Sequence, residues 1–420
     1  MTLSLIQARG FRALRYVRQP LRPFQVLVGA NASGKTTFLD VPAFLGRLVG
    51  AGLDTAVNER SRNFEDLTWR REGGGIELAI EAAIPGELQK KLTGPYDTVR
   101  YEVAIRRGPE EDIELKAERV LLKHGEPVEA IAPRSLFPDN VLPPETIITP
   151  KGKLGKAGAK LVVSKTDGGN DSFYSETKNG SSFNPSFKLG PKKSALANLP
   201  ADETRFPVAT WLKEFLAEGV QQLVLNSLLI RTASPPNLGR RFKSDGSNIP
   251  FVAMGLEKQH PEKFKDWVAH LSTALRDLTG IRVVVRDDDK HAYLMLQYRG
   301  ALEIPSWMAS DGTLRMLALT LPAYLPELRG AFLIEEPENG VHPRAVEALV
   351  QSLSSVYDAQ ILLATHSPVI LSSTRAADVL CFAKNSEGAT DIVAGSEHPG
   401  LAQWKGEVNL ATLFASGVLG

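Results

Sequence analysis

The amino-acid sequence predicts an α/β fold with a wound, mainly parallel sheet, and two observations support this prediction. In the last third of the chain, short apolar segments typical of buried strands alternate with segments of helical periodicity, an order that favours parallel strands joined by helices. The expected strands are 331–334, 360–364 and 379–383, and the expected helices are 314–324 and 343–357. At the other end, a buried strand at 24–28 leads through a glycine-rich loop into a helical pattern over 36–48. We expect this unit to join the same sheet.

The composition is that of an ordinary globular protein. Of 420 residues, 43% are hydrophobic and 23% are charged, which disfavours disorder, fibrous repeats and a membrane-embedded body. The 49 basic and 48 acidic side chains leave a formal charge of +1, so contact with nucleic acid or anionic lipid would need a local patch. The single cysteine, Cys381, excludes an internal disulfide and a cysteine zinc cluster. Since we find neither a signal peptide nor an apolar stretch near the ~20 residues of a membrane span, we expect a cytoplasmic protein without membrane contact.

Between the two ends, the pattern first predicts an antiparallel meander. Residues 76–84, 99–106 and 113–122 each alternate with a period of two, as half-buried strands do.

A lysine-rich segment follows at 151–194. It holds nine lysines, no arginine and seven glycines with little apolar periodicity, which predicts a flexible insertion. Two interpretations stay open. The segment is either a solvated loop or a nucleic-acid arm, in which lysines neutralise phosphates and aromatic rings stack on bases. The aromatic residues in question are Phe173, Tyr174, Phe183 and Phe187.

Helical periodicity returns at 207–230 and at 261–278. The acidic triplet 287–289 lies between two short strand patterns and predicts a polar hairpin turn rather than a metal site, since adjacent side chains on a strand point to opposite faces. We therefore divide the chain into three parts. These are an N-terminal part (1–125), a central insertion (126–300) with the flexible segment 151–194 and a helical part at 205–280, and a C-terminal part (301–420).

A phosphate-binding loop stands between the first buried strand and the first helix. The segment GANASGKT at 29–36 fits G-x-x-x-x-G-K-[ST], and a strand before it and a helix after it are the required context. Small residues let backbone N–H groups surround phosphate oxygens, and the helix N-terminus adds its dipole. We expect Lys35 to reach the β- and γ-phosphates of ATP and Thr36 to ligate Mg²⁺. The predicted nucleotide-binding residues of this region are Gly29, Ala30, Asn31, Ala32, Ser33, Gly34, Lys35, Thr36 and Thr37.

Two adjacent acids end the apolar strand at 331–334. Carboxylates at the carboxyl end of a parallel strand open onto the ligand crevice, and they are costly there unless a cation or water engages them. We assign Glu335 to Mg²⁺, directly or through water, and Glu336 to the attacking water as general base.

Two further segments are candidates for the site. His366 follows another apolar strand, where its side chain would meet the γ-phosphate, so we count it with Lys35 and Glu336 as catalytic. Ser310, Asp311 and Gly312 stand immediately before a helix, where they could bind an anion, cap the helix, or do both.

Together and in this order, these segments resemble the ABC-type ATPase heads of the RecF, SMC and OLD group of AAA-like proteins. The matching segments are ARGFRAL at 8–14, the phosphate-binding loop, SDGT at 310–313, EEPENGVHP at 335–343 and THSP at 365–368. The resemblance implies a P-loop NTPase fold, namely an ABC-ATPase-like head with an antiparallel β-meander subdomain and a mixed helical and irregular central insertion.

The resemblance also implies roles for single residues. Two heads would form a homodimer with ATP and Mg²⁺ sandwiched between them, and residues 310–312 would contact the γ-phosphate bound to the opposite subunit. Asn339 occupies the D-loop position, and Arg12 matches a position near the nucleotide base or phosphates. Ala32 stands where many relatives carry glycine, which the general pattern permits.

Two features of related ATPases are missing from this sequence, and they restrict the subgroup that the chain resembles. The chain has no long coiled coil of the SMC type, and only 38 residues follow Phe382, too few for the Toprim nuclease domain of OLD proteins. What remains resembles the stand-alone OLD-like ATPases of bacterial phage-defence systems, which are often found with a separate effector. We therefore expect a separate partner protein, a nuclease or a toxin, and a role in antiviral defence.

These observations favour an ATP-hydrolysing dimeric switch that controls this effector. Two alternatives stay open: a nucleotide-gated scaffold with negligible hydrolysis, and a DNA-binding, repair-type ATPase that uses residues 151–194. A transporter ATPase is the weakest option, because no Q-loop glutamine stands at the start of the meander.

Overall fold

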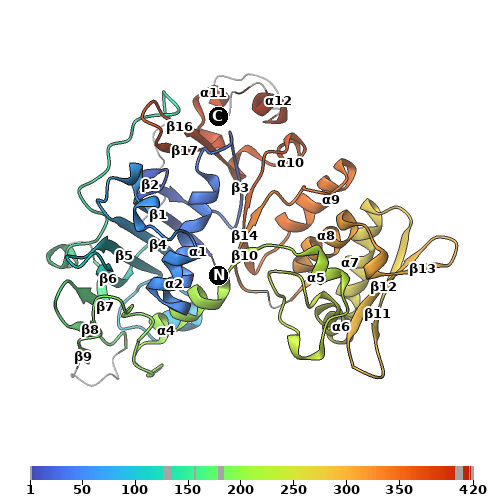
Figure 1. Cartoon of the computed structure of the whole chain (residues 1–420), viewed down its shortest axis with the longest axis horizontal. Helices are drawn as coiled ribbons and strands as arrows, with labels where there is room; N and C mark the ends of the chain where they lie inside the picture. Colours follow the sequence, from blue (N-terminus) through green and yellow to red (C-terminus); the bar gives the residue numbers. More distant parts are fainter. Residues whose placement is uncertain are drawn as a thin grey trace.

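The structure is a computed structural model that describes residues 2–125, 134–155, 158–177, 184–326, 328–402, 410–415 and 417. Its strands form three sheets within these residues, and Figure 1 shows the largest sheet on the left, a central parallel sheet, and a helical part on the right. The helices are α1 (Lys35–Ala51), α2 (Leu53–Asn58), α3 (Gly86–Gln89), α4 (Pro207–Glu214), α5 (Ser227–Arg231), α6 (Ile249–Gln259), α7 (Pro261–Ala274), α8 (Asp311–Thr320), α9 (Pro343–Ser354), α10 (Pro368–Ser372), α11 (Pro399–Ala402) and α12 (Leu410–Ala415).

The central sheet has six strands, and its strand order confirms the predicted wound, mainly parallel sheet. In spatial order the strands are β10 (Val220–Leu223), β14 (Gly330–Glu335), β15 (Ala359–Ala364), β3 (Phe24–Gly29), β16 (Val379–Lys384) and β17 (Thr390–Ala394). Neighbouring strands are parallel except for β16 and β17. Strand β3 thus lies between strands from the far end of the chain.

The largest sheet has eight strands and contains the predicted antiparallel meander. In spatial order its strands are β2 (Leu14–Pro20), β1 (Leu3–Phe11), β4 (Ile76–Ala83), β5 (Thr98–Arg107), β6 (Ile113–Lys123), β7 (Lys160–Thr166), β8 (Asp171–Phe173) and β9 (Ser186–Phe187). The sheet continues across residue 125, where we placed a domain boundary, and that boundary stays a prediction.

Strands β7 to β9 correct the prediction of a flexible segment at 151–194. The segment contributes strands, and it buries an ion pair and one aromatic ring among them. Lys165 Nζ lies 2.7 Å from Asp171 Oδ1, both side chains being buried, and the buried Phe173 ring stacks on Phe187 at 5.3 Å. Phe183 lies outside the described residues. Composition averaged over the segment hides these specific pairs.

The predicted helix at 207–230 is wrong in its second half. Helix α4 is followed by a single helical turn, Phe215–Gly219, and then by β10, which pairs in parallel with β14. Glycine explains the close approach at this point, since a Cβ on Gly330 would lie 2.2 Å from the carbonyl oxygen of Gly219. The second predicted helix, at 261–278, also ends early, because α7 stops at Ala274 and a strand begins at Leu278.

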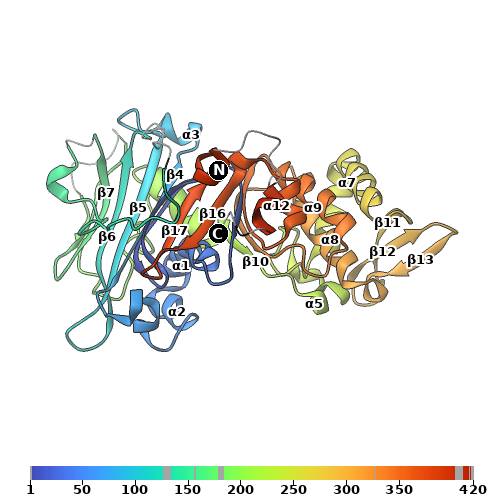
Figure 2. The same ribbon diagram turned by 90° about the horizontal axis from the view of Figure 1, so that it is seen from above.

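The remaining strands form a three-stranded antiparallel sheet beside α6 and α7. They are β11 (Leu278–Val285), β12 (Ala292–Tyr298) and β13 (Leu302–Pro305). The acidic triplet 287–289 lies in the turn between β11 and β12, which confirms the predicted hairpin. Figure 2 shows this sheet projecting away from the central sheet.

Two hydrophobic cores cover the two faces of the central sheet. Along β3, Leu27 belongs to a core shared with α1 and the eight-stranded sheet, whereas Val26 and Val28 belong to a core shared with α8 and α9. A sheet buried on both faces explains why its strands are continuously apolar rather than alternating. Cys381 on β16 is fully buried. No helix in the described part of the chain is long and apolar enough to cross a membrane.

One buried amide ties the two larger sheets together. Gln360 on β15 is fully buried, and its Oε1 accepts a hydrogen bond from the N–H of Leu3 at 2.9 Å. Its Nε2 donates to the carbonyl oxygens of Leu3 and Arg22, each at 2.9 Å. The side chain therefore satisfies three backbone groups at the junction between β1, in the eight-stranded sheet, and the central sheet.

We expect Gln360→Leu to lower the free energy of unfolding by about 3 kcal/mol or more, because each buried group without a partner costs about 1–3 kcal/mol. Chemical denaturation followed by circular dichroism would measure the change. The control is Gln351→Leu on the exposed face of α9, which should change the value by no more than about 0.5 kcal/mol. Equal unfolding curves for the two variants would contradict the assigned role of Gln360.

Candidate nucleotide-binding site

The phosphate-binding loop connects the end of β3 to the start of α1. Its backbone takes positive φ angles at Gly29 (153°), Ala32 (60°) and Gly34 (108°). Ala32 is strained there, since a side chain disfavours the left-handed region. Gly34 also allows close packing, because a Cβ would lie 2.2 Å from Thr390 Oγ1 on β17. Thr390 Oγ1 in turn donates a 2.8 Å hydrogen bond to the carbonyl oxygen of Ser33, so β17 supports the loop.

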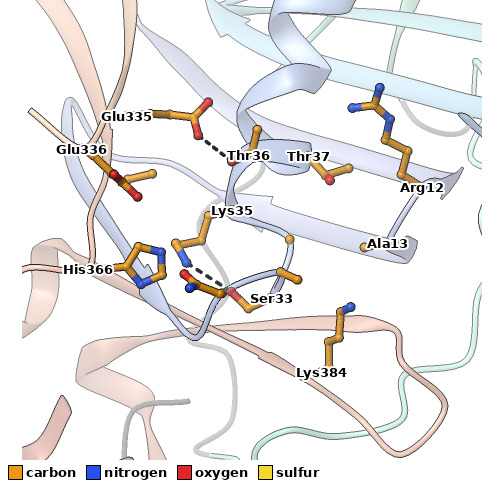
Figure 3. A pocket seen from close by; sticks show the side chains of 14 residues that line it. Arg12, Ala13, Ser33, Lys35, Thr36, Thr37, Glu335, Glu336, His366 and Lys384 are labelled. Carbon is orange, nitrogen blue, oxygen red and sulfur yellow. Dashed lines mark hydrogen bonds between the residues drawn. The ribbon is translucent and has the colours of Figure 1, made fainter. Parts of the chain in front are cut away.

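A pocket of about 450 Å³ opens at this loop (Figure 3). The loop, the β1–β2 turn and the carboxyl ends of β14, β15 and β16 contribute its walls. The lining residues are Arg12, Ala13, Asn31, Ala32, Ser33, Gly34, Lys35, Thr36, Thr37, Glu335, Glu336, Ala364, His366 and Lys384. The fold therefore brings predicted residues of four segments to one cavity, namely Arg12, residues 31–37 of the loop, the two acids after β14, and His366, whereas the predicted Gly29 and Ala30 are not among the lining residues. The volume of this cavity is in the usual range for small-molecule sites.

Lys35 is buried at the bottom of the loop. Its Nζ donates hydrogen bonds to the carbonyl oxygens of Gly29 at 2.8 Å and Ala30 at 3.0 Å. Burial lowers the pKa of Lys35 from 10.5 to about 8, although the charges of Glu336 and Glu335 oppose this shift. The ammonium group therefore stays mostly charged at neutral pH, held by carbonyls that phosphate oxygens can replace.

Glu335 lies beside the hydroxyl of Thr36. Thr36 Oγ1 donates a 2.5 Å hydrogen bond to Glu335 Oε2, and Gln222 Nε2 donates to Glu335 Oε1 at 3.3 Å. Hydroxyl and carboxylate oxygens are hard donors of the kind that Mg²⁺ prefers, so Thr36 and Glu335 fit this ion. The described residues hold no cluster of three or more His, Cys, Asp or Glu side chains arranged for a metal. Mg²⁺ is usually bound through one or two carboxylates together with substrate phosphates and water, and one hydroxyl and one carboxylate are compatible with such a site.

Sequence analysis missed Gln222. Its position on β10 depends on the parallel pairing with β14, which aligns Gln222 with Leu333, two residues before Glu335. We interpreted this segment as helix, and a helix would not have placed the amide there. The available signal was Gly219, which interrupts the helical pattern just before the strand.

Glu336 adopts a strained backbone conformation with a φ of 46°. Its N–H donates to the carbonyl oxygen of Ala364 at 2.8 Å, which ties the end of β14 to the end of β15. Asn339 Nδ2 donates a 2.5 Å hydrogen bond to Glu336 Oε2 and so orients the carboxylate.

His366 lines the pocket on the same side as Glu336 (Figure 3). Burial, assisted by the charge of Lys35, lowers the pKa of His366 below 6.5. The imidazole is therefore neutral at pH 7, with one ring nitrogen able to donate and the other able to accept a hydrogen bond.

The predicted residues at the start of α8, Ser310, Asp311 and Gly312, do not line the pocket. Ser310 caps the helix, because its Oγ accepts a 3.2 Å hydrogen bond from the N–H of Thr313. Gly312 packs against the chain after Glu336, where a Cβ would lie 2.4 Å from the carbonyl oxygen of Gly340. Asp311 is exposed and forms an ion pair with Arg231. Asn339 also lies outside the lining, although it contacts Glu336.

Arg12 lies at the opposite end of the pocket from Glu336. Its NH1 lies 3.3 Å from Asp40 Oδ2, and Asp40 also accepts hydrogen bonds from Arg60. Lys384 shares this end of the pocket and lay outside the predicted set, as did the small residues Ala13 and Ala364.

A family model described as "AAA domain, putative AbiEii toxin, Type IV TA system" matches residues 160–372, slightly more than half of the chain. The chain belongs to this AAA domain family. The matched range contains Glu335, Glu336 and His366, whereas the phosphate-binding loop precedes it. No curated protein matches the chain by sequence.

A solved SMC head has the same fold. The SmcHead bound to the C-winged helix domain of ScpA aligns with a TM-score of 0.51 at 12% identity, over 94% of this chain and 98% of that chain. Two more heads also match. The Pyrococcus furiosus head with an extended coiled coil has a TM-score of 0.49 at 11% identity and coverages of 93% and 95%, and the Thermotoga maritima head has a TM-score of 0.41 at 11% identity and coverages of 94% and 99%. The likeness to the first confirms the predicted SMC-head-like P-loop ATPase fold.

We expect nucleotide binding to take up protons above about pH 8. Phosphate oxygens favour the charged form of Lys35, so binding raises its pKa from about 8. Affinity for ADP should therefore fall as the pH rises through this value, by up to about tenfold per pH unit. Isothermal titration calorimetry in two buffers of different ionisation enthalpy would measure the proton uptake.

The control for this experiment is Lys35→Arg, whose guanidinium stays charged over the whole range and should abolish the uptake. Constant ADP affinity of the unchanged protein between about pH 7.5 and about pH 9.5 would contradict a contact between Lys35 and phosphate.

Proposed function

We propose that the chain binds and hydrolyses ATP as a dimeric switch that controls a separate effector. The observation that supports this most strongly is the convergence of Lys35, Glu335 and Glu336 on one pocket from opposite ends of the sequence. A buried cation, a hydroxyl–carboxylate pair and a second carboxylate are the groups that phosphoryl transfer to water requires.

ATP would bind with its β- and γ-phosphates at the loop and the N-terminus of α1. Backbone N–H groups and Lys35 replace the solvation of the phosphates, and Lys35 exchanges its two carbonyl partners for phosphate oxygens. Mg²⁺ held by Thr36 and Glu335 would neutralise charge on the β- and γ-phosphates. Gln222 holds Glu335 in place through its amide.

Glu336 is the general base in this proposal. Its carboxylate accepts a proton from the attacking water, and Asn339 keeps the carboxylate oriented through its hydrogen bond to Oε2. His366 is neutral because of burial and donates a hydrogen bond to the γ-phosphate. Each of these groups acts on the γ-phosphate end of the pocket.

The dimer is supported by the residues that lie outside the pocket. Ser310, Asp311 and Gly312 begin α8, which lies in the helical part on the right of Figure 1, away from α1. If these residues bind the γ-phosphate, they do so from a second copy of the chain, which makes hydrolysis dependent on closure of the dimer.

The proposed partner of the dimer is a separate effector protein. The description of the AAA family refers to a putative toxin of a toxin–antitoxin system, which has a second component besides the toxin, and this supports a separate partner. We propose that the partner is a nuclease or a toxin in antiviral defence. The repair-type alternative has less support, because Phe173 and Lys165 of the lysine-rich segment are buried in the eight-stranded sheet.

We expect Glu336→Gln to lower the rate of ATP hydrolysis by about 10²–10⁴-fold and to stabilise an ATP-bound dimer. The amide keeps the size of the side chain but accepts no proton. Phosphate release and light scattering after size-exclusion chromatography would measure the two effects. Glu347→Gln on the exposed face of α9 is the control and should behave as the unchanged protein.

Normal hydrolysis by the Glu336→Gln variant would contradict the role of Glu336. An unchanged protein that binds ATP without releasing phosphate would instead favour the nucleotide-gated scaffold.

We expect mixtures of two inactive variants to recover activity if the site is shared between copies. Lys35→Ala disables the phosphate-binding loop, and Ser310→Arg blocks the start of α8. In an equal mixture, half of the dimers are mixed and hold one intact site of two, so about a quarter of the normal rate should return. A steady-state ATPase assay would measure this recovery.

The control mixture combines Lys35→Ala with Glu336→Gln, which both lie in the pocket of one chain and should give no recovery. Absence of recovery in the first mixture, with exchange of subunits demonstrated, would show that the site is complete within one chain.

A further inference from the structure

The order of strands in the central sheet gives the pocket two chemically different ends. Strands β14 and β15 lie on one side of β3 and carry Glu335, Glu336 and His366 at their carboxyl ends. Strand β16 lies on the other side of β3 and ends at Lys384. Figure 3 shows the same division, with the two acids and His366 on the left of the loop and Arg12 and Lys384 on the right.

Pairing with β3 and β17 fixes the position of Lys384. Phe382 aligns with Gly29, the first residue of the loop, so Lys384 leaves the sheet at the level of the loop. On its other side Lys384 is aligned with Thr390. Thr390 Oγ1 donates a 2.8 Å hydrogen bond to the carbonyl oxygen of Ser33 in the loop. The backbone N–H of Thr390 donates a 3.0 Å hydrogen bond to the carbonyl oxygen of Ala13 in the β1–β2 turn. Thr390 therefore connects the strand that carries Lys384 to the phosphate-binding loop and to the β1–β2 turn, which are the two neighbouring walls of the pocket.

The three cations that line the pocket differ in their partners. Lys35 is held by loop carbonyls, and Arg12 is paired with Asp40. Lys384 is exposed at the pocket wall, and its ammonium group has no hydrogen-bond or ion-pair partner among the described residues. The backbone of Lys384 is held by strand pairing, while its Nζ has no partner among the described residues. Lys384 is therefore suited to bind an anion that enters the pocket.

We infer that Lys384 binds the α-phosphate of the nucleotide, at the end of the pocket remote from hydrolysis. The inference rests on the proposed function. With the γ-phosphate at Glu336 and His366 and the β-phosphate at the loop, the chain of three phosphates runs across β3 towards β16. The α-phosphate then arrives between the loop and Lys384. Because ATP and ADP share this phosphate, Lys384 contributes to the binding of both, whereas the groups at the other end distinguish them.

The test measures the affinity for ATP and for ADP in the presence of Mg²⁺ by isothermal titration calorimetry. Glu336→Gln serves as the parent, so that ATP is not consumed. Adding Lys384→Met, which keeps the apolar stem and removes the charge, should weaken ATP and ADP by the same factor, about tenfold. Lys384→Arg should retain most of the affinity. The control is Lys258→Met, an exposed lysine at the end of α6, which should leave both affinities unchanged.

The outcomes separate the inference from the proposed function. If the parent binds both nucleotides and Lys384→Met binds them equally well, the inference is wrong and the proposed function stands. A loss for ATP alone would place Lys384 at the γ-phosphate and also overturn the inference. If the parent binds neither nucleotide, the proposed function fails and the inference with it. Thermal unfolding of each variant shows whether a loss of affinity reflects loss of folded protein.

Discussion

Strand β3 pairs in parallel with β15 on one side and with β16 on the other, and the site depends on this pairing. It joins a strand from the first thirty residues to strands from the last quarter of the chain. Because the carboxyl ends of parallel strands lie at the same edge of a sheet, the loop after β3 meets the acids after β14 and the histidine after β15. Gln360 reinforces the same arrangement, since its buried amide satisfies backbone groups of β1 and of the turn before β3.

Burial at the carboxyl edge of the central sheet lowers the pKa values of two titratable groups in the pocket. Burial lowers the pKa of Lys35 to about 8, and the same burial, with the charge of Lys35, keeps His366 neutral at pH 7. Three residues that line the pocket hold strained backbone conformations, namely Arg12 in the β1–β2 turn, Ala32 in the loop and Glu336 at the end of β14. Such strain persists only where the surrounding structure enforces it, and here hydrogen bonds from Thr390 and Glu336 connect each strained turn to a neighbouring strand.

Local sequence patterns predicted the main elements of the fold and most of the pocket. The loop, Glu335, Glu336 and His366 were found because each follows a short buried strand, a pattern that a sequence displays directly. The patterns failed where tertiary contacts decide the structure. Strand β10 has only four residues, and it is a strand because β14 offers it a parallel partner. Strands β7 and β8 are stabilised by a buried Lys165–Asp171 ion pair. The amino-acid composition of the segment shows only that charged residues are present, not that two of them pair in the interior.

Gln222 and Lys384 are two residues of the site region that local sequence patterns did not predict. Neither belongs to a motif, and each reaches the pocket through the register of its strand with a neighbour that is far away in sequence. The main chemical groups of the site could be predicted from local sequence, because a phosphate-binding loop and acids at strand ends need particular residue types at short spacings. Which strands are neighbours, and therefore which further side chains line the pocket, depends on the packing of the whole chain. Strand order is set by packing between distant segments, and no local spacing encodes that packing.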